Sequence, residues 1–144
     1  MRQELVQRHF HAAVGDLDPV LDHPNLIDYL RSDSENLTFL INTASQLARH
    51  HLAGDALRIA DRLISCSPEL GPYRGRFYYT KAAVLSVGAR SDPEQIPQVA
   101  KHLKFAFIAH ARFKEWYRQD ELFDPIRAQL DAVIDQLPDL PSRF

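Results

Sequence analysis

The apolar residues of this chain recur at intervals of three and four in one segment after another, and that spacing places them on one face of an α-helix. The segments are separated by proline, glycine or clusters of polar residues, which end helices. Only 5 glycines occur in 144 residues, and alternating apolar and polar runs of the kind that mark strands are absent. The sequence therefore predicts an all-α protein.

The periodic segments predict a series of long helices joined by short connections, at 33–51, 55–66, 73–88, 97–113 and 125–137, with a separate turn at 93–96. An N-terminal segment, residues 1–31, holds an amphipathic stretch at 2–14 and one or two helical turns at 24–31. Short connections make consecutive helices antiparallel neighbours. We therefore expect a single domain over 1–144 that consists of this segment, two helix pairs and a final helix, at 33–66, 73–113 and 125–137.

Small residues stand where the helices of the first pair would cross, since only a methyl group lets two backbones approach closely. They are Ala44, Ala56 and Ala60, with Leu47, Leu63 and Pro68 at matching positions. In this pattern residues 37–70 resemble one tetratricopeptide repeat (TPR), a helix–turn–helix unit of about 34 residues. The second pair keeps Tyr79, Ala83 and Ala100 but has a longer loop. The resemblance implies a short right-handed array of helical hairpins.

The end of the chain resembles the last segment of many such repeat proteins, in which a terminal helix covers the apolar face of the last repeat. The residues that carry this resemblance are Asp120, Phe123, Asp124, Pro125, Ile126 and Arg127, followed by a stripe of Leu130, Val133 and Leu137. We therefore expect Leu130 to be buried against the 97–113 helix. Asp131 and Asp135 are expected to face water or the preceding helix.

The resemblance also implies a function, because the first helix of each pair lines a concave groove in proteins of this kind. The groove residues would be Thr38, Ile41, Ser45, Arg49, Phe77, Thr80 and Val84. Some family members clamp the carboxylate tail of heat-shock chaperones with Lys and Asn, but Ile41 and Ser45 stand at the corresponding positions here, so that partner is not expected. We expect a non-enzymatic adaptor that binds a peptide or protein partner.

Residues 101–118 form a second candidate site, with five cationic residues and one acid. On a continuous helix, Lys101, Lys104 and Arg112 fall within about 80° of one another, near Phe105 and Ile108. This basic face would bind an acidic partner or nucleic acid. In the alternative, the final helix covers the face. Phe105 and Ile108 are then core residues, and Asp131 or Asp135 pairs with the lysines.

No catalytic motif is present, and we expect no enzymatic activity, cofactor or bound metal. The 7 histidines lack a ligand spacing and Cys66 has no cysteine partner, whereas zinc needs three or four converging ligands. His110 is expected to be a hydrogen-bonded core residue. The net charge of −2 does not favour nucleic acid, and no segment has the length of a membrane span.

The sequence also bears on compartment and assembly. One cysteine and the absence of a secretory signal indicate a cytoplasmic protein. Two helix pairs are few for a repeat array. Either the N-terminal segment or a second copy of the chain is therefore expected to cover the open end, which gives a monomer or a homodimer.

Overall fold

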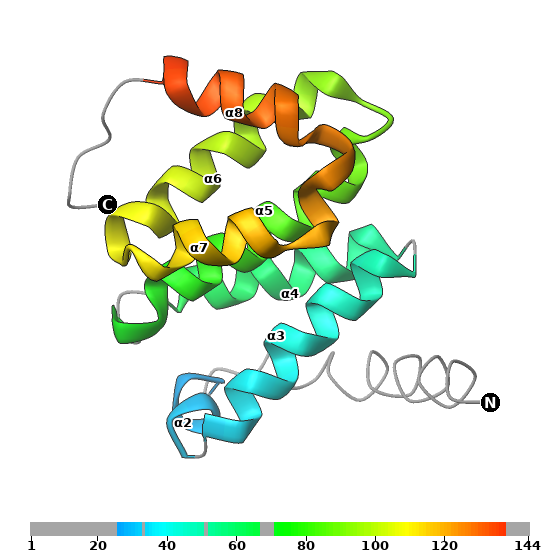
Figure 1. The fold of residues 1–144 in the computed structure, drawn as a ribbon. Coiled ribbons are helices and arrows are strands. Elements are labelled where there is room, and N and C mark those ends of the chain that lie inside the picture. Colours follow the sequence, from blue (N-terminus) through cyan, green and yellow to red (C-terminus); the bar gives the residue numbers. More distant parts are fainter. Residues whose placement is uncertain (1–25, 33, 51, 67–70, 138–144) are drawn as a thin grey trace.

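The computed structural model describes residues 26–32, 34–50, 52–66 and 71–137, and all regular structure in these ranges is helical (Figure 1). The prediction of an all-α protein is confirmed for these residues. The predicted stretch at 2–14 lies outside them. The elements in chain order are α2 (Leu26–Ser32), α3 (Ser34–Arg49), α4 (Ala53–Ser65), η1 (Gly71–Tyr73), α5 (Arg74–Ala89), η2 (Pro93–Gln95), α6 (Ile96–Ala109), α7 (Arg112–Gln119), η3 (Glu121–Ile126) and α8 (Arg127–Gln136).

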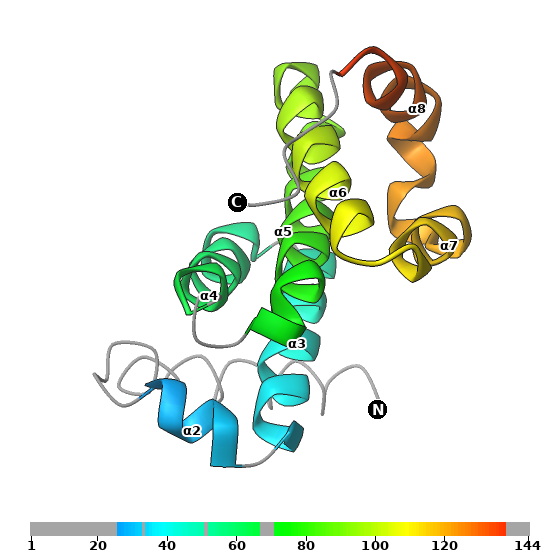
Figure 2. The same cartoon turned by 90° about the vertical axis from the view of Figure 1, so that its left-hand side faces the viewer.

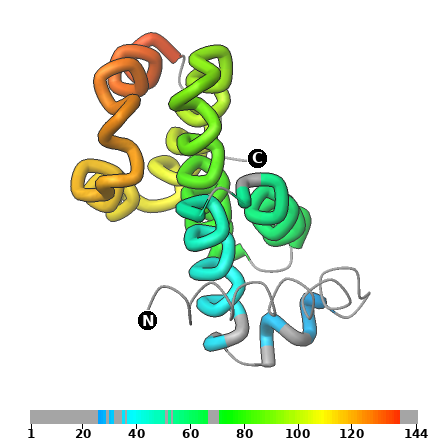
Figure 3. Tube along the Cα trace, turned by 90° about the vertical axis from the view of Figure 1, so that its right-hand side faces the viewer, coloured from blue at the N-terminus to red at the C-terminus, as the bar shows by residue number. Residues whose placement is uncertain are grey.

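Helices that follow one another in the chain pack against one another: α3 with α4, α4 with α5, and α5 with α6. The alanines at the α3–α4 crossing, Ala44, Ala56 and Ala60, have no exposed surface. Helix α3 also contacts α5, and α8 contacts α6. In Figure 2, α4 lies on one side of α5 and α6, and α7 and α8 lie on the other. Figure 3 shows the same order from the opposite side.

Helix α5 belongs to both hydrophobic clusters of the described chain. Phe77 and Val84 join the cluster of α2, α3 and α4. Tyr79 and Ala83 join the cluster formed by α6, α7, η3 and α8. Because apolar contacts surround α5, its sequence lacks the single apolar stripe that marks a surface helix. The helix therefore connects the two halves of the protein.

The chain turns between α5 and α6 at η2, as the sequence predicts for 93–96. The side chain of Asp92 accepts a hydrogen bond from the backbone N–H of Glu94 at 3.3 Å, and Pro97 lies in the first turn of α6. Proline is tolerated there because the first helical N–H groups have no partner within the helix. The local residues therefore determine where α6 begins.

The prediction of one helix over 97–113 is wrong. Helix α6 ends at Ala109, and His110 has φ −161° and ψ 138°, an extended conformation. The expectation that His110 is a core residue is wrong as well, because its side chain is exposed. Its Nδ1 accepts a hydrogen bond at 3.0 Å from the backbone N–H of Arg112, the first residue of a new helix, α7.

The break brings the α6–α7 junction very close to α5. A Cβ atom on Gly75 would lie 2.7 Å from both the Cβ of Ala109 and the ring of Phe113, closer than two carbon atoms approach without displacement. Glycine is therefore required at this crossing for steric reasons. The buried ring of Phe113 also contacts the ring of Tyr79, with 5.8 Å between their centroids.

Candidate functional site

A small pocket lies where α3, α5 and α7 come together. Its volume is about 150 Å³. Its lining includes four of the residues expected from the sequence to line a groove, Ile41, Ser45, Arg49 and Thr80. The other lining residues are Arg76, Tyr79, Ala83, Trp116, Asp120 and Leu122. We call this hollow the concave pocket.

The other three expected groove residues do not line the concave pocket. Phe77 and Val84 are 0% and 1% exposed and pack in the cluster of α2, α3 and α4. Thr38 is half-buried on α3. The face of α5 that meets the pocket instead carries Arg76, Thr80 and Ala83. The expected register of α5 was therefore wrong at Phe77 and Val84.

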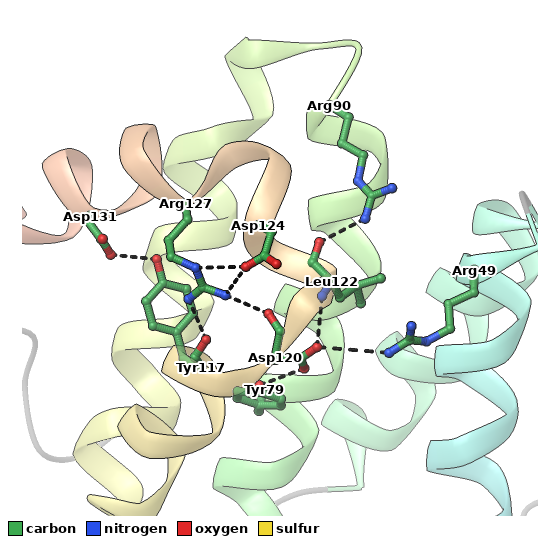
Figure 4. A network of polar contacts seen from close by, with 9 residues as sticks. All are labelled: Arg49, Tyr79, Arg90, Tyr117, Asp120, Leu122, Asp124, Arg127 and Asp131. Atoms are coloured by element: carbon green, nitrogen blue, oxygen red, sulfur yellow. Dashed lines mark hydrogen bonds and ion pairs between the residues drawn. The ribbon is translucent and has the colours of Figure 1, made fainter.

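Asp120 organises the polar side of the pocket (Figure 4). Its Oδ2 accepts a hydrogen bond from the Tyr79 hydroxyl at 2.9 Å, and its Oδ1 accepts one from the backbone N–H of Leu122 at 3.0 Å. Arg49 Nη2 lies 4.0 Å from Oδ1. Burial, followed by the negative charge of Asp120, raises the pKa of the Tyr79 hydroxyl, which stays protonated as a donor. The carboxylate thus links α3, α5 and η3.

Behind Asp120, Arg127 holds the turn between α7 and η3 in place. Its guanidinium donates to the carbonyls of Tyr117 and Asp120, both at 2.6 Å, and to the carboxylate of Asp124 at 2.9 Å. The guanidinium also lies 4.8 Å from the centre of the Tyr117 ring. Arg90 donates to the carbonyl of Leu122 at 2.9 Å (Figure 4). Because these contacts fix the backbone around Asp120, the pocket wall is rigidly supported.

Three side chains of the pocket remain available to a ligand. Trp116 is 41% exposed. The Arg49 side chain is 47% exposed, and its one acidic neighbour in the described chain lies at the limit of ion pairing. Arg76 is half-buried, and no described acid lies within ion-pair distance of its guanidinium. The pocket therefore offers two cationic groups and an indole ring beside an apolar floor.

Sequence reasoning missed Arg76, Tyr79, Trp116 and Asp120 as members of this site. Trp116 carried a signal, since it is the only tryptophan of the chain and stands among charged residues. The bond between Tyr79 and Asp120 joins positions 41 residues apart, and no local pattern indicates such a pair.

The predicted basic face of 101–118 is divided by the break at His110. Lys101 lies over the ring of Phe105, Lys104 Nζ donates to the carbonyl of Leu137 at 2.7 Å, and Arg112 lies on α7 over the ring of Phe113. The alternative, in which α8 covers this face, is also wrong in its details. Ile108 is 38% exposed, and Asp131 accepts a hydrogen bond from the Tyr117 hydroxyl rather than pairing with a lysine.

Within the described ranges, no three His, Cys, Asp or Glu side chains converge as metal ligands, and no helix has the length and apolarity to cross a membrane. Cys66 is buried. No protein-family model matches the chain, and neither a curated protein nor a solved structure matches it.

Proposed function

We propose that the chain is a non-enzymatic interaction module, a short TPR-like array that binds a peptide of a partner protein on the face shared by α3, α5 and α7. In this interpretation α3, α5 and α7 are the first helices of three successive helix pairs, and α4, α6 and α8 are the second helices. The packing of each helix on the next, and of α3 on α5, supports that arrangement.

The observation that carries the proposal is the composition of the concave pocket. Trp116, Arg49 and Arg76 come from three different helices and surround one hollow. Exposed tryptophan and arginine are the residues that most often dominate the binding energy of protein interfaces. Small-molecule sites usually occupy about 300–1,000 Å³. A pocket of about 150 Å³ suits one side chain of a peptide.

The two arginines indicate the chemistry of the peptide. An acidic residue next to the inserted side chain would place a carboxylate between Arg49 and Arg76, and arginine binds carboxylates with paired hydrogen bonds. The carboxylate of Asp120, which also lines the pocket, is already bound by the Tyr79 hydroxyl and the backbone N–H of Leu122. The rest of the lining is apolar or carries hydroxyl groups, so the inserted side chain is small and uncharged. The proposed ligand is therefore an acidic peptide with a small apolar anchor.

A displayed library of random peptides, selected against the full chain, tests this proposal. Selected peptides should be enriched in Asp or Glu next to a small apolar residue. Arg76→Glu and Trp116→Ala should each weaken their binding about tenfold or more, as at interface hot spots. Thr80 is not a suitable site for a charge, because it is 3% exposed and its hydroxyl donates to the carbonyl of Arg76.

Lys101→Glu is the matched control, because it reverses one charge on exposed α6 surface outside the pocket. It should leave the dissociation constant unchanged, and circular dichroism should show the same helical content in all variants. If Lys101→Glu abolishes binding while Arg76→Glu does not, the basic face of 101–118 is the binding surface. Failure to select any peptide with an acidic residue would reject the proposed ligand.

A further inference from the structure

A second and larger hollow lies between α6, α7 and α8, with a volume of about 860 Å³. Helix α7 packs on α5 and α6, and α8 packs on α6, but the backbones of α7 and α8 pack little against each other (Figure 1). Side-chain contacts of Tyr117 with Arg127 and Asp131 bridge the two helices. The two helices diverge across η3, so a strip of α6 between them is left uncovered. We call this hollow the α6–α8 groove.

The floor of the α6–α8 groove is apolar. Phe107 and Ile108 of α6 line it together with Ile134 and Leu137 at the α8 side. Ile108 is 38% exposed, and the other three side chains are half-buried. An apolar centre surrounded by charged residues is the usual composition of a protein interface. The floor therefore has the character of a surface that a partner covers.

The α7 edge of the groove is positive, and Lys104 of α6 reaches across to the C-terminal end of α8. Lys104 Nζ donates to the carbonyl of Leu137, and Lys114 Nζ lies 6.0 Å from the centre of the Phe107 ring. Both contacts are with uncharged groups, and no acid in the described chain lies within ion-pair distance of either ammonium. Arg118 adds a second cation on the α7 edge, although Glu115 pairs with it at 2.8 Å.

The α8 edge carries two acids, Asp131 and Asp135, beside Arg127. The guanidinium of Arg127 is bound by the Asp124 carboxylate and by the carbonyls of Tyr117 and Asp120. Asp131 and Asp135 lie one helical turn apart, a spacing at which two like charges destabilise a helix. The Tyr117 hydroxyl donates to Asp131 at 2.6 Å, but no described cation lies within ion-pair distance of either carboxylate. The groove thus has one basic edge and one acidic edge along an apolar floor.

We propose that the α6–α8 groove binds an amphipathic helix of a partner protein, with acidic residues along the edge that meets α7 and basic residues along the edge that meets α8. Such a helix would insert an apolar stripe between α7 and α8 and cover the exposed strip of α6. It would also supply the opposite charges that Lys114 and Asp135 lack. This site is separate from the concave pocket and does not depend on the function proposed for it.

The charge pattern favours a helix over nucleic acid as the occupant. A phosphate backbone would meet the cations on one edge, but Asp131 and Asp135 would repel it on the other. The apolar floor also offers no pattern of cations along its length. A helix with two differently charged flanks matches all three parts of the groove.

The test is a displayed library of helical peptides about 18 residues long, or about five turns. Each peptide carries a fixed apolar stripe, and Glu, Lys or Gln is allowed at the positions beside it. Selection against the full chain should enrich Glu on one flank and Lys on the other. Lys114→Glu should weaken binding of the selected peptide about tenfold or more, and exchanging the charges of the matching peptide flank should restore it.

Two further variants separate this site from its alternatives. Ile108→Glu should abolish binding, because it places a charge on the apolar floor, whereas Arg76→Glu in the concave pocket should have no effect. The proposal is overturned if the selected peptides show no difference between flanks, or if Arg76→Glu rather than Ile108→Glu removes binding. Circular dichroism on each variant must show unchanged helical content.

Other occupants give different results. Concentration-dependent dimers that Ile108→Glu dissociates, measured by light scattering, would identify a second copy of the chain as the occupant. Tighter peptide binding by the double variant Leu140→Asp Phe144→Asp would identify the chain's own C-terminal residues as a competitor. Either result would overturn a partner helix as the natural ligand, and unchanged binding by the double variant supports it.

Discussion

Single polar side chains hold distant parts of this protein together. Asp120 accepts hydrogen bonds from Tyr79 on α5 and from the backbone of η3, and Arg127 binds the carbonyls on either side of that turn. Charged groups in such bonds usually contribute about 1.5–3 kcal/mol each. The sequence shows that Asp120 and Arg127 belong to a terminal segment, but it does not show that Tyr79 is the partner of Asp120.

The concave pocket shows which of its residues could be predicted from the sequence and which could not. Ile41, Ser45 and Arg49 recur at four-residue intervals on α3, and the pattern places them on one face, where the structure has them. On α5 the same reasoning selected Phe77 and Val84, which lie in the core. The difference arises because α3 has a polar face that sets its register, whereas apolar and small residues surround α5.

His102 makes stability depend on pH. Burial lowers the pKa of its imidazole below the usual 6.5, despite the hydrogen bond to the carbonyl of Gln98, and the nearby cations Lys81 and Lys101 lower it further. The unfolded chain therefore binds the proton first as pH falls. Stability is fully present above a pH of about 6.5 and is lost as the pH drops toward the folded pKa.

We expect the urea midpoint of the wild type to fall between about pH 7.5 and pH 5.5 by more than that of His102→Gln. Glutamine can still donate to the carbonyl of Gln98 but does not titrate. Equal falls in the two proteins would show that His102 does not contribute to the acid sensitivity.

At the scale of elements, the sequence predicts where helices begin better than where they end. Asp92 and Pro93 locate the start of η2, and Pro97 locates the start of α6 to within one residue. No glycine or proline marks the end of α6, so the α6–α7 break was missed. The break coincides with a tertiary contact: the junction lies against Gly75, and Phe113 lies beside Tyr79.

Gly75→Ala tests this contact. An added methyl group would lie 2.7 Å from Ala109 and Phe113, so the α6–α7 junction must move. We expect a loss of roughly 1–3 kcal/mol in the free energy of unfolding, although alanine is the better helix former. Urea unfolding measures the loss.

Gly54→Ala is the matched control for that experiment. Gly54 lies in the first turn of α4, and a Cβ there meets no atom within 4 Å. Alanine should stabilise the protein by about 0.5–1 kcal/mol at this position. If the two substitutions have the same effect, the close contact at Gly75 does not limit the side chain.

At the scale of the whole molecule, the terminal segment completes the second cluster. Leu122, Phe123, Ile126 and Leu130 are all buried in it, and α8 contacts α6 as the sequence predicts. The prediction that Leu130 is buried is confirmed, with 0% exposure. The apolar stripe and Pro125 made α8 predictable. The gap between α7 and α8 depends on the course of η3, and the sequence did not predict it.

Leu130→Asp should therefore destabilise the whole protein. It removes a buried leucine and places a charge in an apolar contact, which together cost roughly 3–6 kcal/mol. A domain of this size is usually stable by about 5–15 kcal/mol, so urea unfolding should show most of the stability lost. Asp135→Asn, at an exposed position of the same helix, should change it by no more than about 0.5 kcal/mol. A soluble Leu130→Asp protein with wild-type stability would contradict the role of α8 as a cap.

The position of α5 between the two clusters also has a consequence for biosynthesis. Chains fold from the N-terminus as they leave the ribosome, at about 5–20 residues per second. The first cluster receives Phe77 and Val84 from α5, so α2, α3 and α4 cannot complete their core until that helix has emerged. During this interval the nascent chain exposes the apolar surface of α3 and α4. The synthesis of α5 is therefore the step that completes the first cluster, and it also exposes the residues of α5 that wait for α6, α7, η3 and α8.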